Sequence, residues 1–394
     1  MMKGIKNTFV FLHRWLGLIS GAIVLVICLT GALLVFEKDI RSFTEPFQLV
    51  KASDQPMLAP GTIAKMVEKK TGKQLSNISY PGRDKSVVCT LKTAKRRSQS
   101  ILIYVNPYSG KILKVKELEK DFFKWLITGH YYLWLPVKVG KIVVATATLV
   151  FLVLLISGLV LWFPGKRNSI KRSFLIKWRA KRKRLLYDLH NVLGFYSLLL
   201  LVVLSVSGLI FGFKWFDKAF YRLTSGGAEM AEMRKPSSEV IAAGAMLVNA
   251  DTLFTQYMLP KILQGHVQTL YFPAKKKDAF MLYDNPDGDT RFRRNTRFFD
   301  QYSLEELHGK GAGFYAGNFE EASLADRLKR MNYDIHVGSV LGWPSKLMAF
   351  AASLVGVLLV VTGYWMWLGS RFKNRKHVPK KAKIVKNKTL ERQI

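Results

Sequence analysis

The chain of 394 residues is 49% hydrophobic and strongly basic, with 61 Lys and Arg against 27 Asp and Glu and a net charge of +34. Its apolar residues are grouped in long blocks, which is typical of membrane proteins rather than of soluble domains. Most of the basic excess lies directly beside these blocks, where it sets membrane topology and contacts anionic lipid headgroups. The charge therefore argues against a nucleic-acid partner.

Four apolar blocks, at residues 15–36, 142–163, 191–213 and 345–368, are long enough to cross a hydrocarbon core of about 30 Å. The first is too long for a cleavable signal and lacks a small-residue cleavage pattern, so we interpret it as a retained helix. Residues 166–184 carry ten Lys and Arg and no acidic residue. Because basic loops stay in the cytoplasm, both termini and this loop are predicted inside and the two long loops outside.

The first external stretch has the pattern of a small α+β unit. Residues 59–72 have helical spacing and end at Gly72, a C-cap signal. Short strands are predicted at 78–80, 87–91 and 100–105, and the turn at 106–113 leads into a last strand. The second external stretch repeats this in weaker form, with a helix at 236–248, strands at 266–272 and 279–283, and 298–307 in the place of 104–113.

The fold class predicted is a mainly α membrane protein: a bundle of four transmembrane helices built from a duplicated helix–module–helix unit, with two small α+β modules outside. The duplication rests on three residues that recur at an offset of 177, because His13, Gly17 and Gly31 return as His190, Gly194 and Gly208. The predicted segments are helix 1 (9–36), module 1 (37–120), an aromatic segment with helix 2 (121–163), the basic loop (164–186), helix 3 (187–214), module 2 with a connection (215–335), helix 4 (336–369) and the basic tail (370–394).

Histidines provide the main candidate chemistry. Four of the seven lie at or just before the amino-terminal ends of the membrane helices, and topology places His13 and His190 near the inner face and His130 and His336 near the outer face. Because a haem iron takes axial imidazoles from both faces, this pattern predicts two b-type haems, an inner and an outer one. The haem iron would be the metal that these residues bind.

Several points of this interpretation stay open. The glycines near the histidines would give room for a flat macrocycle, or they serve ordinary close helix packing. Pro136 may separate His130 from its helix, in which case His308 could replace it, whereas His266 and His377 are read as a strand and a tail residue. Candidate partners for haem propionates, or simple lipid-facing anchors, are Arg14, Lys138 and Lys141.

Other chemistry is not indicated. The chain has no CxxCH motif, so any haem would be held non-covalently, and it has no GxGxxG after a strand, P-loop, HExxH or GxSxG. Cys28 and Cys89 are predicted on different sides of the hydrocarbon and form no disulfide framework. Electrons would therefore come from a cytoplasmic reductase or from quinol.

The sequence resembles the PepSY-associated transmembrane family of bacterial inner-membrane proteins. The resemblance rests on LHRWLGL (12–18), NPYSGKIL (106–113), ISGLVLWFPG (156–165), LHNVLGF (189–195), FDQYSLEEL (299–307) and DIHVGSVLGWP (334–344). It implies four membrane helices with periplasmic PepSY modules, and some members are ferric-siderophore reductases that carry two haems. By resemblance, His13, His190, His130 and His336 would be the haem ligands. One departure is Leu304, which stands where a glycine is usual.

The leading hypothesis is transmembrane electron transfer from a cytoplasmic donor or quinol to a periplasmic ferric chelate, which would make the protein a ferric-siderophore reductase that supports iron acquisition. Residues that could attract an anionic chelate, or equally form an exposed strand face, are Phe272, Arg291, Phe292, Arg293 and Arg294. The alternative is a haem-free, membrane-anchored PepSY protein that binds peptides or regulates a protease. A permease for chelated iron is disfavoured because the helices contain no intramembrane charge and no broken, polar segment.

Overall fold

The computed structural model describes residues 3–92, 101–163, 170–231, 233–238, 246–308 and 313–374. Parts of five predicted segments lie outside the described residues. These are the first residue of the strand predicted at 100–105, part of the basic loop (164–169), the middle of the second predicted module helix (239–245), part of a glycine-rich connection (309–312) and the tail from 375 onward, which contains His377.

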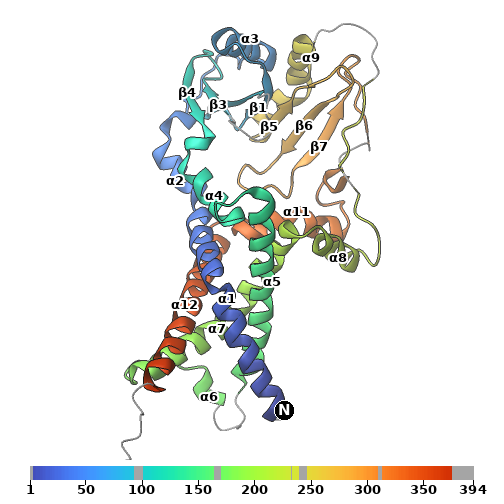
Figure 1. Cartoon of the computed structure of the whole chain (residues 1–394). Helices are drawn as coiled ribbons and strands as arrows, with labels where there is room; N and C mark the ends of the chain where they lie inside the picture. The colour runs from blue at the N-terminus through green and yellow to red at the C-terminus, as the bar shows by residue number, and fades with distance from the viewer. Residues whose placement is uncertain are drawn as a thin grey trace, which may run out of the picture.

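Four long helices run side by side in one half of the molecule (Figure 1). They are α1 (Lys3–Val35), α5 (Val137–Trp162), α7 (Arg182–Gly212) and α12 (Trp343–Asn374). Each is long and apolar enough to cross a membrane. Large apolar side chains such as Ile19 and Leu199 are exposed on their outer faces, as expected where lipid rather than protein covers a helix. The four predicted membrane helices are confirmed, and the protein is a multi-pass membrane protein.

The other half of the molecule contains one antiparallel sheet of seven strands. The first external stretch provides β1 (Leu75–Tyr80), β2 (Val87–Leu91), β3 (Ile101–Val105) and β4 (Ile112–Glu117), and the second provides β5 (Val267–Tyr271), β6 (Phe280–Asn285) and β7 (Asn295–Phe299). The strand order is β4-β3-β2-β1-β5-β6-β7. The two predicted modules are therefore joined through β1 and β5, where Asn77 pairs with Tyr271 and Tyr80 with Gln268. The pairing satisfies main-chain groups that two separate sheets would each leave open at an edge.

One hydrophobic core spans both halves of this sheet. On one face lie α3 (Pro60–Thr71) and a continuous helical segment made of α9 (Met246–Leu253), one π turn η4 (Phe254–Met258) and α10 (Leu259–Leu263). Ile63 of α3 and Met258 of η4 belong to the same buried cluster as Ile78 of β1 and Leu270 of β5. The helix predicted at 59–72 is thus confirmed, with Gly72 as its left-handed C-cap at φ 66°.

The turn in which Leu304 replaces a glycine keeps the geometry of its counterpart. Gly110 has φ 71° and Leu304 has φ 62°. In both turns an acidic or amide side chain, Asn106 or Asp300, accepts hydrogen bonds from the amides two and three residues later. Leu304 is partly buried against the core, and this packing offsets a backbone conformation that is unfavourable by about 1–2 kcal/mol for a residue with a Cβ.

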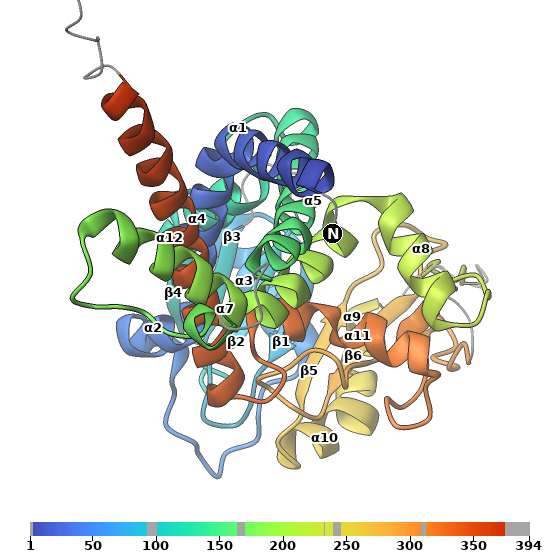
Figure 2. The same cartoon turned by 90° about the horizontal axis from the view of Figure 1, so that it is seen from below.

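Shorter elements connect the sheet to the bundle. Around the first pair of membrane helices these are α2 (Glu37–Thr44), η1 (Pro46–Gln48), η2 (Leu118–Lys120) and α4 (Phe122–Tyr132). Around the second pair they are α8 (Lys214–Thr224), η5 (Gly313–Tyr315) and α11 (Leu324–Val337). The short helix α6 (Ile170–Ser173) lies between α5 and α7 in the chain, at the end of the bundle away from the sheet (Figure 1). Both α4 and α11 lie between the sheet and the membrane helices, and α1 begins at the opposite end of the bundle (Figures 1 and 2).

Candidate functional site

The structure brings four histidines together in two pairs. His13 of α1 faces His190 of α7, with ring centroids 6.3 Å apart, and we call these residues the far pair because they lie towards the end of the bundle away from the sheet. His130 of α4 faces His336 of α11 at 6.1 Å, and we call these the sheet-side pair. Sequence reasoning predicted both pairings. It placed His336 at the start of membrane helix 4 and His130 in the aromatic segment before helix 2. Both lie on separate helices, α11 and α4, which precede α12 and α5.

Every imidazole is held in the same way by a hydroxyl on a neighbouring helix. The Nδ1 atoms lie 2.8 Å (His13–Ser157), 2.9 Å (His190–Thr362), 3.1 Å (His130–Thr30) and 2.9 Å (His336–Ser207) from the hydroxyl oxygens. Each hydroxyl donates its own proton to a backbone carbonyl three or four residues earlier in its helix. Because a hydroxyl has one proton, Nδ1–H must be the donor to it. This assigns the tautomer in which Nε2 carries the free lone pair.

A glycine follows each of these hydroxyl residues and makes room for the imidazole. A Cβ built on Gly31, Gly158, Gly208 or Gly363 would lie 3.2–3.6 Å from Cε1 of the histidine held by the preceding residue. The missing side chain of each glycine therefore leaves the space in which the imidazole ring lies. Each histidine of the two pairs is thus held by one Ser-Gly or Thr-Gly dipeptide of a membrane helix. Sequence reasoning noted the glycines but missed the hydroxyls, because the same dipeptide also occurs elsewhere in the chain, for example at Ser20-Gly21 and Ser109-Gly110.

Each pair opens into a cavity among the helices. The cavity at the far pair has a volume of about 520 Å³ and that at the sheet-side pair about 390 Å³. Both lie in the range of about 300–1,000 Å³ that is usual for cofactor and ligand sites. Phe151 and Val24 line both cavities, so these two side chains separate them.

Basic side chains line both cavities. Lys6 and Arg14 line the far one, and Lys38, Lys141 and Lys346 line the other. Arg14 and Lys141 were singled out from the sequence, whereas Lys6, Lys38 and Lys346 were not. Lys138, which was also singled out, is not among the residues that line either cavity.

The Nε2 atoms are available for a ligand. In the part of the chain that the structure describes, none of the four has a hydrogen-bond partner. Nor do the described residues contain a cluster of three or more His, Cys, Asp or Glu side chains that could hold a bare metal ion. Two neutral imidazoles that face each other across a cavity are suited to bind a metal centre from two opposite sides.

The remaining described histidines lie elsewhere. His308, the possible substitute for His130, has a side chain that is 82% exposed, and its Nδ1 lies 3.7 Å from Glu306. His266 was read as a strand residue but directly precedes β5, and its Nδ1 is 2.7 Å from a carboxylate oxygen of Asp284 in β6. Neither belongs to a pair.

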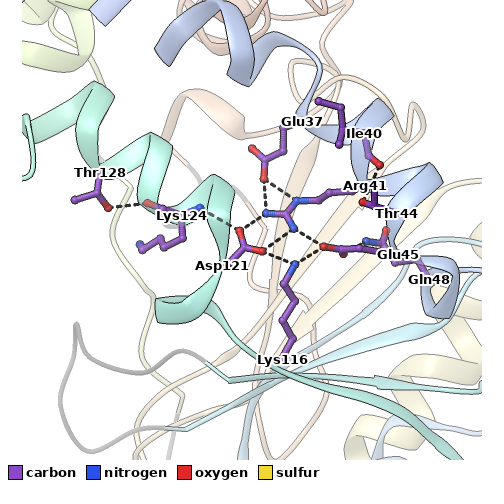
Figure 3. A network of polar contacts seen from close by, with 10 residues as sticks. All are labelled: Glu37, Ile40, Arg41, Thr44, Glu45, Gln48, Lys116, Asp121, Lys124 and Thr128. Atoms are coloured by element: carbon purple, nitrogen blue, oxygen red, sulfur yellow. Dashed lines mark hydrogen bonds and ion pairs between the residues drawn. The ribbon is translucent and has the colours of Figure 1, made fainter. Parts of the chain in front are cut away.

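A partly buried ion-pair network fixes the helix that carries His130 (Figure 3). Asp121 is the N-cap of α4 and accepts a hydrogen bond from the amide of Lys124. The Arg41 guanidinium of α2 donates two hydrogen bonds to the same carboxylate, at 2.9 and 2.5 Å, and also contacts Glu37 and Glu45. Lys116 of β4 lies 2.7 Å from Asp121 and 2.5 Å from Glu45. The network therefore connects α2, the sheet and α4.

The charges in this network reinforce one another. Burial alone would raise the pKa of Asp121, but hydrogen bonds from Arg41 and Lys116 outweigh it and hold the pKa well below its ordinary value. The same balance of burial against a hydrogen bond from Lys116 lowers the pKa of Glu45. Both carboxylates are thus charged at neutral pH and fix the start of α4.

Comparison with known proteins gives one match. A family model described as the PepSY-associated TM region matches residues 10–370, a range that includes the four membrane helices, the sheet and both histidine pairs. No curated protein matches the chain.

Proposed function

The chain belongs to the PepSY-associated TM family, and from that premise we propose that it is a transmembrane ferric-chelate reductase whose two histidine pairs each hold one b-type haem. Electrons would come from a cytoplasmic reductase or from quinol, and the acceptor would be a ferric, siderophore-type chelate at the sheet end. The reduced, ferrous chelate would release its iron because hard oxygen ligands hold ferrous iron less tightly than ferric iron. The reaction would thereby support iron acquisition.

The spacing within the two pairs carries this proposal. Two metal–nitrogen bonds of about 2 Å, plus ~1 Å from each ring centre to its coordinating nitrogen, would separate the centroids of two imidazoles that bind the same metal by about 6 Å. The observed separations are 6.3 and 6.1 Å. Metal-ligating histidines usually donate their other N–H to a fixed acceptor, and a Ser or Thr hydroxyl has that role at all four positions. The residues present therefore fit the group.

Each part of the chain has a defined task in this proposal. A bound haem supplies a one-electron redox centre whose potential depends on its axial ligands and burial. The Ser and Thr hydroxyls orient the imidazoles, and the apolar cavity walls exclude water. Arg14 and Lys6 at one cavity, and Lys141, Lys38 and Lys346 at the other, provide positive charge for the propionates.

The proposed location is the bacterial inner membrane, with both termini in the cytoplasm and the sheet in the periplasm. Ten Lys and Arg in residues 166–184, between α5 and α7, support this orientation. The far pair would then lie near the cytoplasmic donor and the sheet-side pair near the periplasmic acceptor.

Absorption spectra of the detergent-purified protein, oxidised and then reduced, test the proposal. We expect two low-spin b-type haems per chain. His13→Ala should remove one and His336→Ala the other, whereas His308→Ala should keep both because that side chain is exposed and belongs to neither pair. A protein that stays colourless when expressed with ample haem would refute the proposal and favour the haem-free, PepSY-type function.

A further inference from the structure

Three arginines gather beside the sheet-side cavity, and among the residues that the structure describes none of the three forms an ion pair with a carboxylate. The Arg294 guanidinium stacks over the rings of Tyr283 and Tyr315, 4.1 Å from each centroid, and Arg291 lies 3.9 Å from the centroid of Tyr333. Within the described residues neither guanidinium forms an ion pair, and the buried Nε of Arg294 has no hydrogen-bond partner. We call Arg291, Arg294 and these three tyrosines the arginine–tyrosine site.

The third arginine, Arg330, adds a positive charge that its carbonyl partners do not neutralise. Arg330 is fully buried at 1% exposure, and within the described residues its guanidinium donates hydrogen bonds to the carbonyls of residues 314, 316 and 317 and to no carboxylate. The guanidinium groups of Arg294 and Arg330 lie 4.1 and 5.8 Å from the ring centroid of Tyr315. Burial and the Asp334 carboxylate raise the pKa of the Tyr315 hydroxyl, and the positive charges of the three arginines act in the opposite direction. Such a group of like charges is unfavourable unless an anion compensates it.

The carboxylate of Asp334, which lies nearby, does not neutralise the site through a direct ion pair. Its oxygens accept hydrogen bonds from the backbone amide of Arg291 and from the hydroxyl of Ser339. Within the described residues, the guanidinium groups of Arg291 and Arg294 donate no hydrogen bond and so keep donors for a ligand. A ligand can approach, because Arg291 is exposed and the three tyrosines are only half-buried.

The location connects the site to the histidine pair. Tyr333 lies on α11 three residues before His336, and both side chains line the sheet-side cavity. Tyr283 lies on β6, on the sheet face away from the main core, beside Tyr271 at 5.0 Å. In the segment that carries two of the arginines, Phe292 is buried and packs against Phe319 at 4.8 Å, which fixes the loop. Phe272, which the sequence also suggested, is buried in the main core.

We propose that the arginine–tyrosine site binds a ferric chelate that is anionic and carries aromatic, catecholate-type rings. Guanidinium groups pair with the phenolate oxygens of such a ligand, and the tyrosines stack on its rings. Uncharged hydroxamate chelates lack both features. The inference rests on the proposed reductase function, since it names the acceptor and places it next to the cavity of the sheet-side pair.

Equilibrium binding to the full chain in detergent, without an electron donor, tests the site. The probes are the trianionic ferric tris-catecholate complex and, for comparison, the uncharged ferric tris-acetohydroxamate complex, followed by quenching of tryptophan and tyrosine fluorescence. We expect the anionic complex to bind at least tenfold more tightly, with an affinity that falls as salt is added.

Three variants locate the binding. Arg294→Gln and Arg291→Gln should each weaken binding of the anionic complex roughly tenfold or more, because each removes a charge-assisted contact. The matched control is Arg293→Gln, in the same loop, whose guanidinium is half-exposed and faces Glu320 at 3.9 Å. Arg294→Lys keeps the charge and should retain part of the affinity, which separates lost contact from lost folding.

The outcomes distinguish this inference from the reductase function. Equal affinity for both complexes, or equal binding by the Arg294→Gln and Arg293→Gln variants, would overturn the proposed site. Binding is measured without electron transfer, so a colourless protein that still binds the anionic complex would refute the reductase while leaving the site intact. A protein that contains haem but does not bind the complex would refute the site alone.

Discussion

The substitution Arg41→Met tests whether the ion-pair network holds the helix that carries His130. Arg41 donates to three carboxylates, those of Glu37, Glu45 and Asp121. Methionine keeps the apolar stem and removes the charge, which leaves Lys116 as the one cation of the network for those three groups. Breaking a buried pair by removing one partner costs about 3–5 kcal/mol. The network is only partly buried and Lys116 still compensates two carboxylates, so we expect no more than the lower end, about 3 kcal/mol.

That loss can be measured as local opening of α4. A change of about 3 kcal/mol corresponds to an opening equilibrium that is more than 100-fold greater. Amide hydrogen exchange in peptides that cover residues 122–132 should therefore become roughly 100-fold faster in the Arg41→Met variant, while the sheet core keeps its protection. Arg41→Lys should fall between the two, since it retains the charge but loses the planar fork that contacts several carboxylates.

The matched control is Lys120→Met. Lys120 forms an ion pair with Glu117 at 3.0 Å, close to the network in sequence, but its side chain is 78% exposed. Exposed pairs contribute about 0–1 kcal/mol, so exchange in α4 should change no more than a few-fold. If Arg41→Met and Lys120→Met gave the same exchange rates in α4, the network would not be what fixes this helix.

Three further outcomes are expected. If the proposed haems are bound, Ser157→Ala should weaken haem retention roughly 10–100-fold, because it removes the hydrogen-bond acceptor of the His13 imidazole. Ser197→Ala should not, because the Ser197 hydroxyl donates to a carbonyl of its own helix. Transfer of haem to a scavenging protein measures both variants. Gly140→Ala should disrupt the turn between α4 and α5, because the added Cβ would lie 2.2 Å from the backbone carbonyl oxygen of Tyr132. The control is Gly369→Ala, whose Cβ would meet no atom within 4 Å. Thermal unfolding should therefore show a lower midpoint temperature for Gly140→Ala alone. The Asp121 and Glu45 carboxylates beside Lys116 have lowered pKa values. Their stabilising effect should therefore be complete at neutral pH and be lost only as the pH falls below about 4, the pKa of such groups in an unfolded chain. Tryptophan fluorescence between pH 7 and pH 3 follows this loss.

Local patterns in the sequence predicted much of this structure. Long apolar runs identify membrane helices without knowledge of their neighbours, and the strand predicted at 87–91 is confirmed without change. The pairing of His13 with His190 followed from a repeat and from loop charge. These features depend on stretches of chain that are short or regular, so a single sequence is enough to find them.

Contacts between distant segments were not predicted. Nothing in residues 75–80 shows that β1 pairs with β5 rather than remaining an edge. The helix α4 was read as an aromatic segment, because its end depends on a turn in which Leu133 and Trp134 both have positive φ values, an uncommon choice for such residues. The hydroxyls of Ser157 and Thr362 matter only through side chains of other helices, which no local pattern specifies.

The pairing of β1 with β5 has a consequence for biogenesis. Asn77 and Tyr271 are almost two hundred positions apart, and α5 and α7 both lie between them in the chain. The central pair of strands can form only after both of these membrane helices and β5 have been synthesised. Until then β1 exposes an unpaired edge, and such edges promote aggregation. Completion of the sheet is therefore a late step of assembly, and a chain truncated before residue 267 would be a substrate for chaperones and proteases rather than a stable half-protein.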